Sequence, residues 1–274
     1  MRIGNREFDV QNRTYIMGIL NVTPDSFSDG GRYEKTDAAL FHAEQMIKDG
    51  ADLIDIGGES TRPGYTMVLA REEAERILPV IRAVKERFDI PVSVDTCKAS
   101  VAKSAVREGA DLVNDIWGLK YDQKMAGIIA KADVACCLMH NRNNAQYVNF
   151  FEDLKADLGE SVKLAKRAGI DDDKIILDPG VGFAKSYEQN LEAIRRLSEL
   201  SSLGFPVLLG TSRKSVIGLT LDLPVSERVE GTIATTVMAV ERGCAFVRVH
   251  DVKENIRAVR MTEQILKERK SDGF

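Results

Sequence analysis

Short apolar runs recur along this chain, and each is followed by a longer segment in which apolar residues recur at three- and four-residue spacing. The runs are apolar throughout, which is typical of strands covered on both faces. The longer segments have the spacing of helices that bury one face. The runs lie at 15–22, 53–57, 91–96, 112–116, 134–140, 175–178, 206–211 and 246–250, and helical patterns lie at 70–88, 151–168, 187–201 and 253–267. The pattern predicts eight βα units with a parallel sheet.

Eight units in 274 residues match the size of one (β/α)8 barrel, so we expect an α/β protein with a single TIM-barrel domain, its units spanning 15–268. Residues 1–14 lie outside the units, and 3–8 predict a small hairpin that closes the N-terminal mouth of the barrel. Glycines at 50, 109, 169 and 243 stand between a helix and a strand, as C-caps do. An open doubly wound sheet is the rival architecture. Its GxGxxG fingerprint is not met, because Lys185 stands where the third glycine is expected.

Composition and charge narrow the class of protein. A net charge of −4 argues against a nucleic-acid partner, although a local cationic pocket for an anionic ligand remains compatible with it. No apolar stretch approaches the ~18 residues of a membrane span, and the first residues lack the apolar region of a signal peptide. We therefore expect a cytoplasmic protein with no membrane partner. The cysteines at 97, 136, 137 and 244 form no CxxC pair, which favours reduced, structural thiols.

The candidate chemistry lies where the predicted strands end. In such barrels functional groups sit at the carboxyl ends of the strands, and here those ends are polar. For one residue a cap or a turn is an adequate explanation, but eight polar ends at one rim favour a site, since so many buried polar groups are costly without a ligand. The ends carry Asn21, Glu59 to Arg62, Asp95, Asn114 and Asp115, His140, Asp178, Ser212 to Lys214, and Arg248 with His250.

These groups divide into two kinds. Lys214, Arg62, Arg248 and His250 supply donors for an anionic group such as a phosphate. A second set, Asp95, Asp178 and Asn114, offers acceptors and one amide donor to a flat heterocycle with adjacent N–H groups, such as a purine or a pterin.

Two long, polar loops follow the first two strands. Residues 23–33 and 58–66 are rich in Gly, Ser and Asp. They are either surface loops or lids that close over a reactive intermediate to exclude water.

Ordered motifs occur along nearly the whole chain, at 21–31 (NVTPDSFSDGG), 55–64 (DIGGESTRPG), 93–96 (SVDT), 114–115 (ND), 139–140 (MH), 178–183 (DPGVGF), 210–214 (GTSRK) and 248–251 (RVHD). Together they resemble the motifs of dihydropteroate synthases. The resemblance implies attack of p-aminobenzoate on the methylene of 6-hydroxymethyl-7,8-dihydropterin diphosphate, giving dihydropteroate and pyrophosphate in folate biosynthesis.

The resemblance also implies a role for each matching residue. The pterin contacts would be Asp95, Asn114, Met139, Asp178 and Lys214, the diphosphate contacts Asn21, Thr61, Arg248 and His250, and the p-aminobenzoate pocket Phe27, Arg62, Pro63, Phe183 and Ser215. Asp95, Lys214 and Arg62 would be catalytic, with Asp95 stabilising a cationic pterin methylene. Mg²⁺ would be bound by Asn21. A homodimer and sensitivity to sulfonamides are further implications, and the only other partners expected are the small-molecule substrates.

Two departures from the family pattern are visible. Residues 141–144 (NRNN) replace a second Met and a Gly/Pro-rich stretch, so the family pattern does not predict the conformation of the fifth βα loop. Ala184 replaces a frequent glycine, a small change with no evident chemical cost. The nearest rival function is a pterin-binding methyltransferase that serves a corrinoid partner, which should lack 212–214 (SRK) and the 61–64 loop. A non-enzymatic pterin or nucleotide carrier is the other rival.

Overall fold

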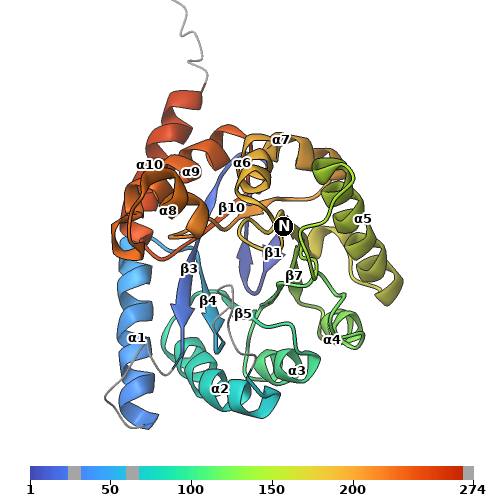
Figure 1. The fold of residues 1–274 in the computed structure, drawn as a ribbon. Coiled ribbons are helices and arrows are strands. Elements are labelled where there is room, and N and C mark those ends of the chain that lie inside the picture. Colours follow the sequence, from blue (N-terminus) through green and yellow to red (C-terminus); the bar gives the residue numbers. More distant parts are fainter. Residues whose placement is uncertain (24–31, 60–67, 268–274) are drawn as a thin grey trace, which may run out of the picture.

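A computed structural model describes residues 1–23, 32–59 and 68–267 of the chain, and in it helices form a ring around a barrel of parallel strands (Figure 1). The barrel strands are β3 (Tyr15–Asn21), β4 (Leu53–Gly57), β5 (Val92–Asp95), β6 (Leu112–Asp115), β7 (Ala135–Met139), β8 (Ile175–Asp178), β9 (Leu208–Leu209) and β10 (Phe246–Val249). The predicted (β/α)8 architecture is confirmed.

The sheet closes on itself. Its hydrogen-bonded order is β8-β7-β6-β5-β4-β3-β10-β9, with every ladder parallel. The two outer strands meet through a parallel bridge between Leu177 and Val207, where the Leu177 amide donates to the Pro206 carbonyl at 2.9 Å. A barrel rather than a doubly wound sheet results, so all the strand ends surround one mouth.

Helices follow the strands in chain order. They are α1 (Arg32–Asp49), α2 (Ala70–Arg87), α3 (Ala99–Arg107), α4 (Met125–Ala132), α5 (Phe150–Ala168), α6 (Tyr187–Arg195), α7 (Leu197–Leu200), α8 (Ser215–Leu221), α9 (Val229–Glu241) and α10 (Val252–Leu266). Local sequence fixes several ends. Ser186 and Gln189 form a capping box on α6, and Gly169 ends α5 at a φ of 89°.

The core has two parts. The larger lies between the strands and the surrounding helices. The smaller fills the N-terminal end of the barrel, where Ile3 and Phe8 of the terminal hairpin pack against Met17 and Phe246. This hairpin, β1 (Arg2–Ile3) and β2 (Arg6–Glu7), crosses the middle of the ring in Figure 1. The predicted hairpin and its closing role are confirmed, and the opposite end of the barrel is left for the site.

Two predicted elements differ from the structure beyond a residue or so at their ends. The helix expected at 187–201 is interrupted at Arg196, which has φ −102° and ψ 19°. Apolar residues are buried on both sides of the break, so periodicity did not reveal it. The strand expected at 206–211 is reduced to β9, because Pro206 has no N–H to extend the ladder.

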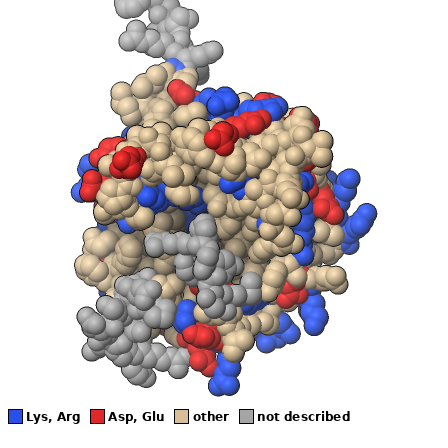
Figure 2. All heavy atoms as spheres, viewed as in Figure 1, with Lys and Arg blue, Asp and Glu red and all other residues tan. Residues whose placement is uncertain are grey.

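Other sequence expectations can also be compared with the structure. All four cysteines are buried free thiols, as predicted. In the described part of the chain, no helix combines the length and the apolar character needed to cross a membrane. On the face shown in Figure 2, acidic and basic side chains are interspersed.

Candidate active site

Strand register brings the predicted polar residues together at the C-terminal mouth. Asp95 is paired with Asn114 on one side and with Gly57 on the other, and Gly57 is paired with Asn21. Asp178 lies beside Met139. Residues far apart in the sequence therefore meet at one rim, as the strand ends predicted.

Gly210, which follows β9, lies close to three predicted site residues, Asp178, Arg248 and Lys214. A β-carbon built on it would be 3.8 Å from Asp178 Oδ2, 3.8 Å from Arg248 Cβ and 3.9 Å from Lys214 Nζ. The carboxylate and the two cations therefore line the same part of the mouth.

A buried ion-pair network lies at the base of this site. Arg248 donates from Nε to Asp55 Oδ2 at 2.6 Å and from Nη2 to Asp95 Oδ2 at 2.7 Å. Asp55 also accepts from Ser93 Oγ at 2.5 Å and from Asn114 Nδ2 at 3.3 Å. The network sets the positions of Arg248, Asp95 and Asn114 relative to one another.

Asp55 was given no role in the sequence analysis, although it is fully buried and bonded to three of its neighbours. The available signal was a single carboxylate inside the apolar run at 53–57. Arg248 was predicted to bind the diphosphate, and in the structure its Nε and Nη2 atoms are already engaged by carboxylates.

Asp95 has one unbonded oxygen. Its Oδ1 atom is buried and has no hydrogen-bond partner among the described residues, while Oδ2 is bonded to Arg248. Burial raises the pKa of Asp95, and Arg248 opposes that rise. A buried acceptor without a partner is costly, so it indicates a ligand donor.

Asp178 and Lys214 add two further buried charges to the mouth. Asp178 Oδ1 accepts from the Gly180 amide at 2.7 Å, and burial raises its pKa, with Lys214 opposing. Lys214 Nζ donates to the Val181 carbonyl at 2.5 Å. Burial lowers the pKa of Lys214 to about 8, although the Asp178 carboxylate raises it. Both charges are thus held in a site of low dielectric, where their interactions with a ligand are strong.

An apolar cluster completes the site. Met139 packs with Cys97 and Ile116, and the partly buried Trp117 and Phe183 border this group. The Phe183 ring centroid lies 4.8 Å from Lys214 Nζ, a cation–π distance. Apolar side chains beside an edge of acceptors suit a flat heterocycle.

The predicted site residues not yet described are those of the two loops, Ser215 and His250. Phe27, Thr61, Arg62 and Pro63 lie outside the described residues, as do most of the two expected lids. Ser215 is the first residue of α8, directly after Lys214. His250 Nδ1 lies 3.0 Å from Ser212 Oγ.

A Mg²⁺ ion would have one predicted protein ligand, Asn21. Its Oδ1 atom lies 3.8 Å from where a Gly57 β-carbon would stand, at the same edge as Asp95. In the described part of the chain, no group of three or more His, Cys, Asp or Glu side chains could hold a metal ion. A single neutral amide oxygen fits Mg²⁺ only when substrate phosphates and water complete the shell, which is a common arrangement for this ion.

His140 does not belong to the mouth, although it ends a strand. Its side chain is fully buried and lies between Asp157 of α5 and Lys185. Lys185 was seen in the sequence only as an interruption of a glycine pattern. Two of its acceptors are carbonyls of the preceding turn and the third is His140, 45 residues earlier, and carbonyl acceptors leave no mark in the sequence.

Ala184 has a conformational cost that the sequence analysis did not expect. Its φ is +43°, in the left-handed region that disfavours residues with a β-carbon. The change from glycine is therefore chemically small but strains the backbone.

Comparison with known proteins gives one consistent result. The model of a family described as pterin binding enzyme matches residues 17–250. A dihydropteroate synthase of Clostridium beijerinckii is 59% identical over 97% of this chain and 100% of the relative. One of Bacillus subtilis is 54% identical over 93% of this chain and 90% of the relative.

Solved structures agree. A dihydropteroate synthase from Clostridium difficile, crystallised in the presence of pteroic acid, superposes with a TM-score of 0.93 at 52% identity, covering 96% of this chain and 100% of that one. A Xanthomonas albilineans dihydropteroate synthase with 4-aminobenzoic acid has a TM-score of 0.90 at 40% identity, with 94% and 95% covered.

Proposed function

This chain belongs to the pterin-binding enzymes and, within them, to the dihydropteroate synthases, and we propose how its barrel mouth joins a pterin diphosphate to p-aminobenzoate. It is a transferase of folate biosynthesis. The observation that carries the proposal is the convergence of buried Asp95, Asn114 and Asp178 with Lys214 and Arg248 at one mouth.

The pterin ring binds between the acceptor edge and the apolar cluster. Asp178 accepts from two adjacent N–H groups of the ring, and Asn114 adds an amide on the same edge. Lys214 donates to the ring carbonyl side, with Met139 against the ring face. The unbonded Asp95 Oδ1 supports this arrangement, because a ring N–H would satisfy it.

The diphosphate lies toward Arg248, His250 and Asn21, with Thr61 as a further contact. Mg²⁺, held by Asn21 together with substrate phosphates, would neutralise charge on the leaving group. Arg248 supports the same end through the guanidinium that Asp55 and Asp95 hold in place. Positioning of this kind acts on charge that develops as the bond breaks.

Bond exchange needs no nucleophile from the protein. The C–O bond between the methylene and the diphosphate breaks, and its electron pair leaves with pyrophosphate. The amine of p-aminobenzoate then forms a C–N bond to the methylene carbon and releases its proton to solvent. Asp95 stabilises the positive charge on the pterin in between, which requires its carboxylate form.

The second substrate is placed by Phe183 and Ser215, with Phe27, Arg62 and Pro63 from the two loops. The Phe183 ring beside Lys214 supports this location, since it brings the pocket next to the pterin site. The Xanthomonas albilineans relative was solved with 4-aminobenzoic acid, which supports this compound as the second substrate.

Two further properties belong to this proposal. A Yersinia pestis dihydropteroate synthase has been solved with a sulfonamide drug, and we expect sulfonamides to compete with p-aminobenzoate here. We also expect a homodimer formed by helices late in the barrel, where Leu219, Met261 and Ile265 are exposed. Light scattering of the purified chain tests the dimer.

Pyrophosphate release tests the function. The protein, Mg²⁺ and the pterin diphosphate should release pyrophosphate only when p-aminobenzoate is added. A methyltransferase or a pterin carrier would release none. Binding of the pterin without p-aminobenzoate-dependent release would therefore contradict the proposal.

A further inference from the structure

The turn between β8 and α6 connects both halves of the site. Asp178 ends the strand before it, and residues 180–183 form the turn itself, which ends in Phe183. A β-carbon on Gly182 would lie 3.1 Å from the Lys214 Cδ atom, so the lysine side chain rests on this turn. Movement of the turn would therefore displace Phe183 and Lys214 together.

This turn contains one residue in a strained conformation. Gly180, Gly182 and Ala184 all have positive φ, at 66°, 88° and 43°, and only Ala184 has a β-carbon. Glycine is required at 180, because a β-carbon there would lie only 2.0 Å from the His140 carbonyl oxygen. The conformation of Ala184 persists only where surrounding contacts determine it.

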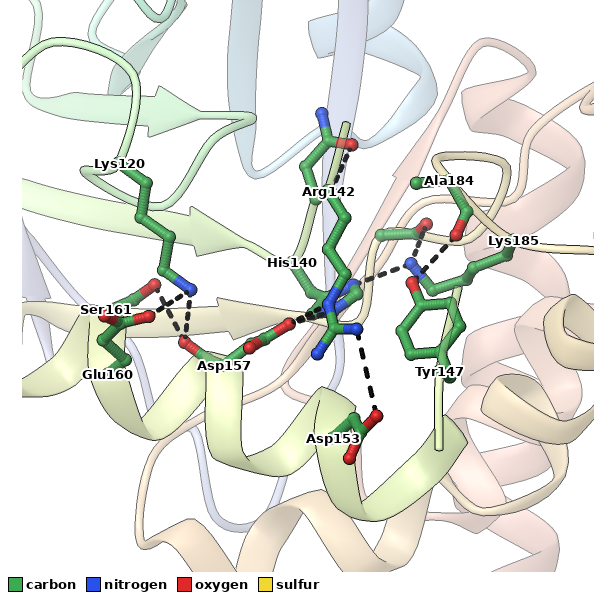
Figure 3. A network of polar contacts seen from close by, with 12 residues as sticks. Lys120, His140, Arg142, Tyr147, Asp153, Asp157, Glu160, Ser161, Ala184 and Lys185 are labelled. Atoms are coloured by element: carbon green, nitrogen blue, oxygen red, sulfur yellow. Dashed lines mark hydrogen bonds and ion pairs between the residues drawn. The ribbon is translucent and has the colours of Figure 1, made fainter. Parts of the chain in front are cut away.

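Lys185 supplies those contacts from within the protein. Its Nζ atom donates to the Gly180 carbonyl at 2.9 Å, to the Phe183 carbonyl at 3.0 Å and to His140 Nδ1 at 2.8 Å (Figure 3). An ammonium group has three N–H donors, and here each has an acceptor. The first two bonds join the start of the turn to its end.

His140 connects this lysine to α5. Because its Nδ1 accepts from Lys185, its Nε2 carries the hydrogen and donates to Asp157 Oδ2 at 3.0 Å. Burial and the nearby Lys185 charge together lower the pKa of His140 to about 4, although the hydrogen bond to Asp157 opposes this, so the imidazole is neutral. Arg142 donates from Nε to the same Asp157 oxygen at 2.6 Å.

Arg142 belongs to the stretch at 141–144 that departs from the family pattern. Its guanidinium also stacks on the Tyr147 ring, 4.4 Å from the centroid. Tyr147 Oη in turn donates to the Ala184 carbonyl at 2.8 Å, directly beside the strained residue. The departing loop is thus part of the same support, as Figure 3 shows.

We propose that Lys185 is a positioning residue for p-aminobenzoate, because its ammonium group, oriented by His140 and Asp157, holds the turn that places Phe183 against Lys214. The inference rests on the proposed function and adds a residue to it. Asp178 and Asn114 lie on strands that are held without Lys185, so these two pterin contacts are independent of it, whereas Lys214 follows the turn.

The charge of Lys185 makes this support pH-dependent. Burial lowers its pKa to about 7, Asp178 and Asp157 oppose this, and Lys214 and Arg142 add to it. The charged form prevails below that pKa. As pH rises through it, the amine loses one of its three donors, and the turn loses one of its bonds.

Lys185→Met tests the proposal because it keeps an unbranched chain and removes every donor. We expect the KM for p-aminobenzoate to rise at least about tenfold, and the affinity for a pterin analogue to fall by a smaller factor, because Asp178 and Asn114 keep their places. In the unsubstituted protein we expect the KM to rise with pH, and Lys185→Met should lose this rise. Lys120→Met is the matched control, because Lys120 binds the same helix at the Asp157 carbonyl and Glu160 but does not contact the turn.

A merely structural effect would lower kcat through a smaller active fraction and leave KM and its pH profile unchanged. An unchanged KM or an unchanged pH profile in Lys185→Met overturns the proposal, as does a KM equal to that of Lys120→Met. If Lys185→Met does not fold, Tyr147→Phe removes only the bond to Ala184, and its KM for p-aminobenzoate should rise about threefold. An unchanged KM there overturns the proposal. Failure of the unsubstituted protein to turn over would instead remove the proposed function and this inference together.

Discussion

Arg248 Nη2 lies 2.7 Å from Asp95 Oδ2, so the guanidinium occupies one oxygen of the carboxylate and leaves the buried Oδ1 unbonded. The same guanidinium binds Asp55, which is fully buried. Arg248 therefore has two roles at once, as the counter-ion of two carboxylates and as a cation near the expected diphosphate.

Replacing Arg248 with Met should destabilise the fold. Removing one partner of a buried ion pair leaves its carboxylates uncompensated, which costs about 3–5 kcal/mol. Urea denaturation measures the free energy of unfolding. Adding Asp55→Asn should restore part of the loss, because one buried charge is then removed. Wild-type stability in the single variant would contradict a structural role for Arg248.

Replacing Asp178 with Asn should weaken pterin binding about a hundredfold, because the amide keeps the Gly180 bond but presents an N–H to ring donors. Calorimetry with a pterin analogue measures the dissociation constant. Asp173→Asn is the control, since Asp173 is exposed on the loop before β8. Equal affinity in both variants would exclude Asp178 from the site.

The pH dependence of kcat/KM for the pterin diphosphate should report Asp95. Its pKa is raised by burial, and the carboxylate form is the one that stabilises a cation. Activity should therefore fall as pH decreases through this raised pKa, above the ordinary range of an aspartate. Asp95→Asn should have low activity at every pH without this acidic limb. An acidic limb that persists in the variant would assign it to another group.

The raised pKa of Asp95 affects stability and activity in opposite directions, because stability falls and activity rises as the pH increases through it. A raised pKa means that the folded state binds this proton more tightly than the unfolded state, so the contribution is present at low pH and is lost as pH rises through the folded pKa. Asp95→Asn should therefore be at least as stable as the unsubstituted protein at neutral pH, where the carboxylate is costly. Thermal unfolding at several pH values measures this difference.

Removal of Mg²⁺ should lower turnover while leaving pterin binding intact. The ion is expected to act on the diphosphate, through Asn21 and substrate phosphates, and the ring contacts lie elsewhere. Activity in EDTA and the Mg²⁺ requirement of Asn21→Ala are the measurements. Full activity without metal, or an unchanged Mg²⁺ requirement in the variant, would contradict the assignment.

The sequence was sufficient for the barrel and for the residues at strand ends, because both depend on local pattern. Asp95, Asn114 and Asp178 follow apolar runs, and parallel strands bring their ends to one rim. Ion pairs across the barrel could not be predicted from local pattern, since partners such as Arg248 and Asp55 are 193 residues apart. Lys185 was missed because two of its partners are backbone carbonyls, which no side chain marks, and the third, His140, is 45 residues away.

The most direct measurement of the central claim is the stoichiometry of the reaction. Mass spectrometry of a mixture of this protein, Mg²⁺, the pterin diphosphate and isotope-labelled p-aminobenzoate quantifies labelled dihydropteroate, and a coupled assay quantifies pyrophosphate. We predict equal amounts of the two products, both abolished by Asp178→Ala. Pyrophosphate without labelled dihydropteroate, or neither product from folded protein, would contradict the account.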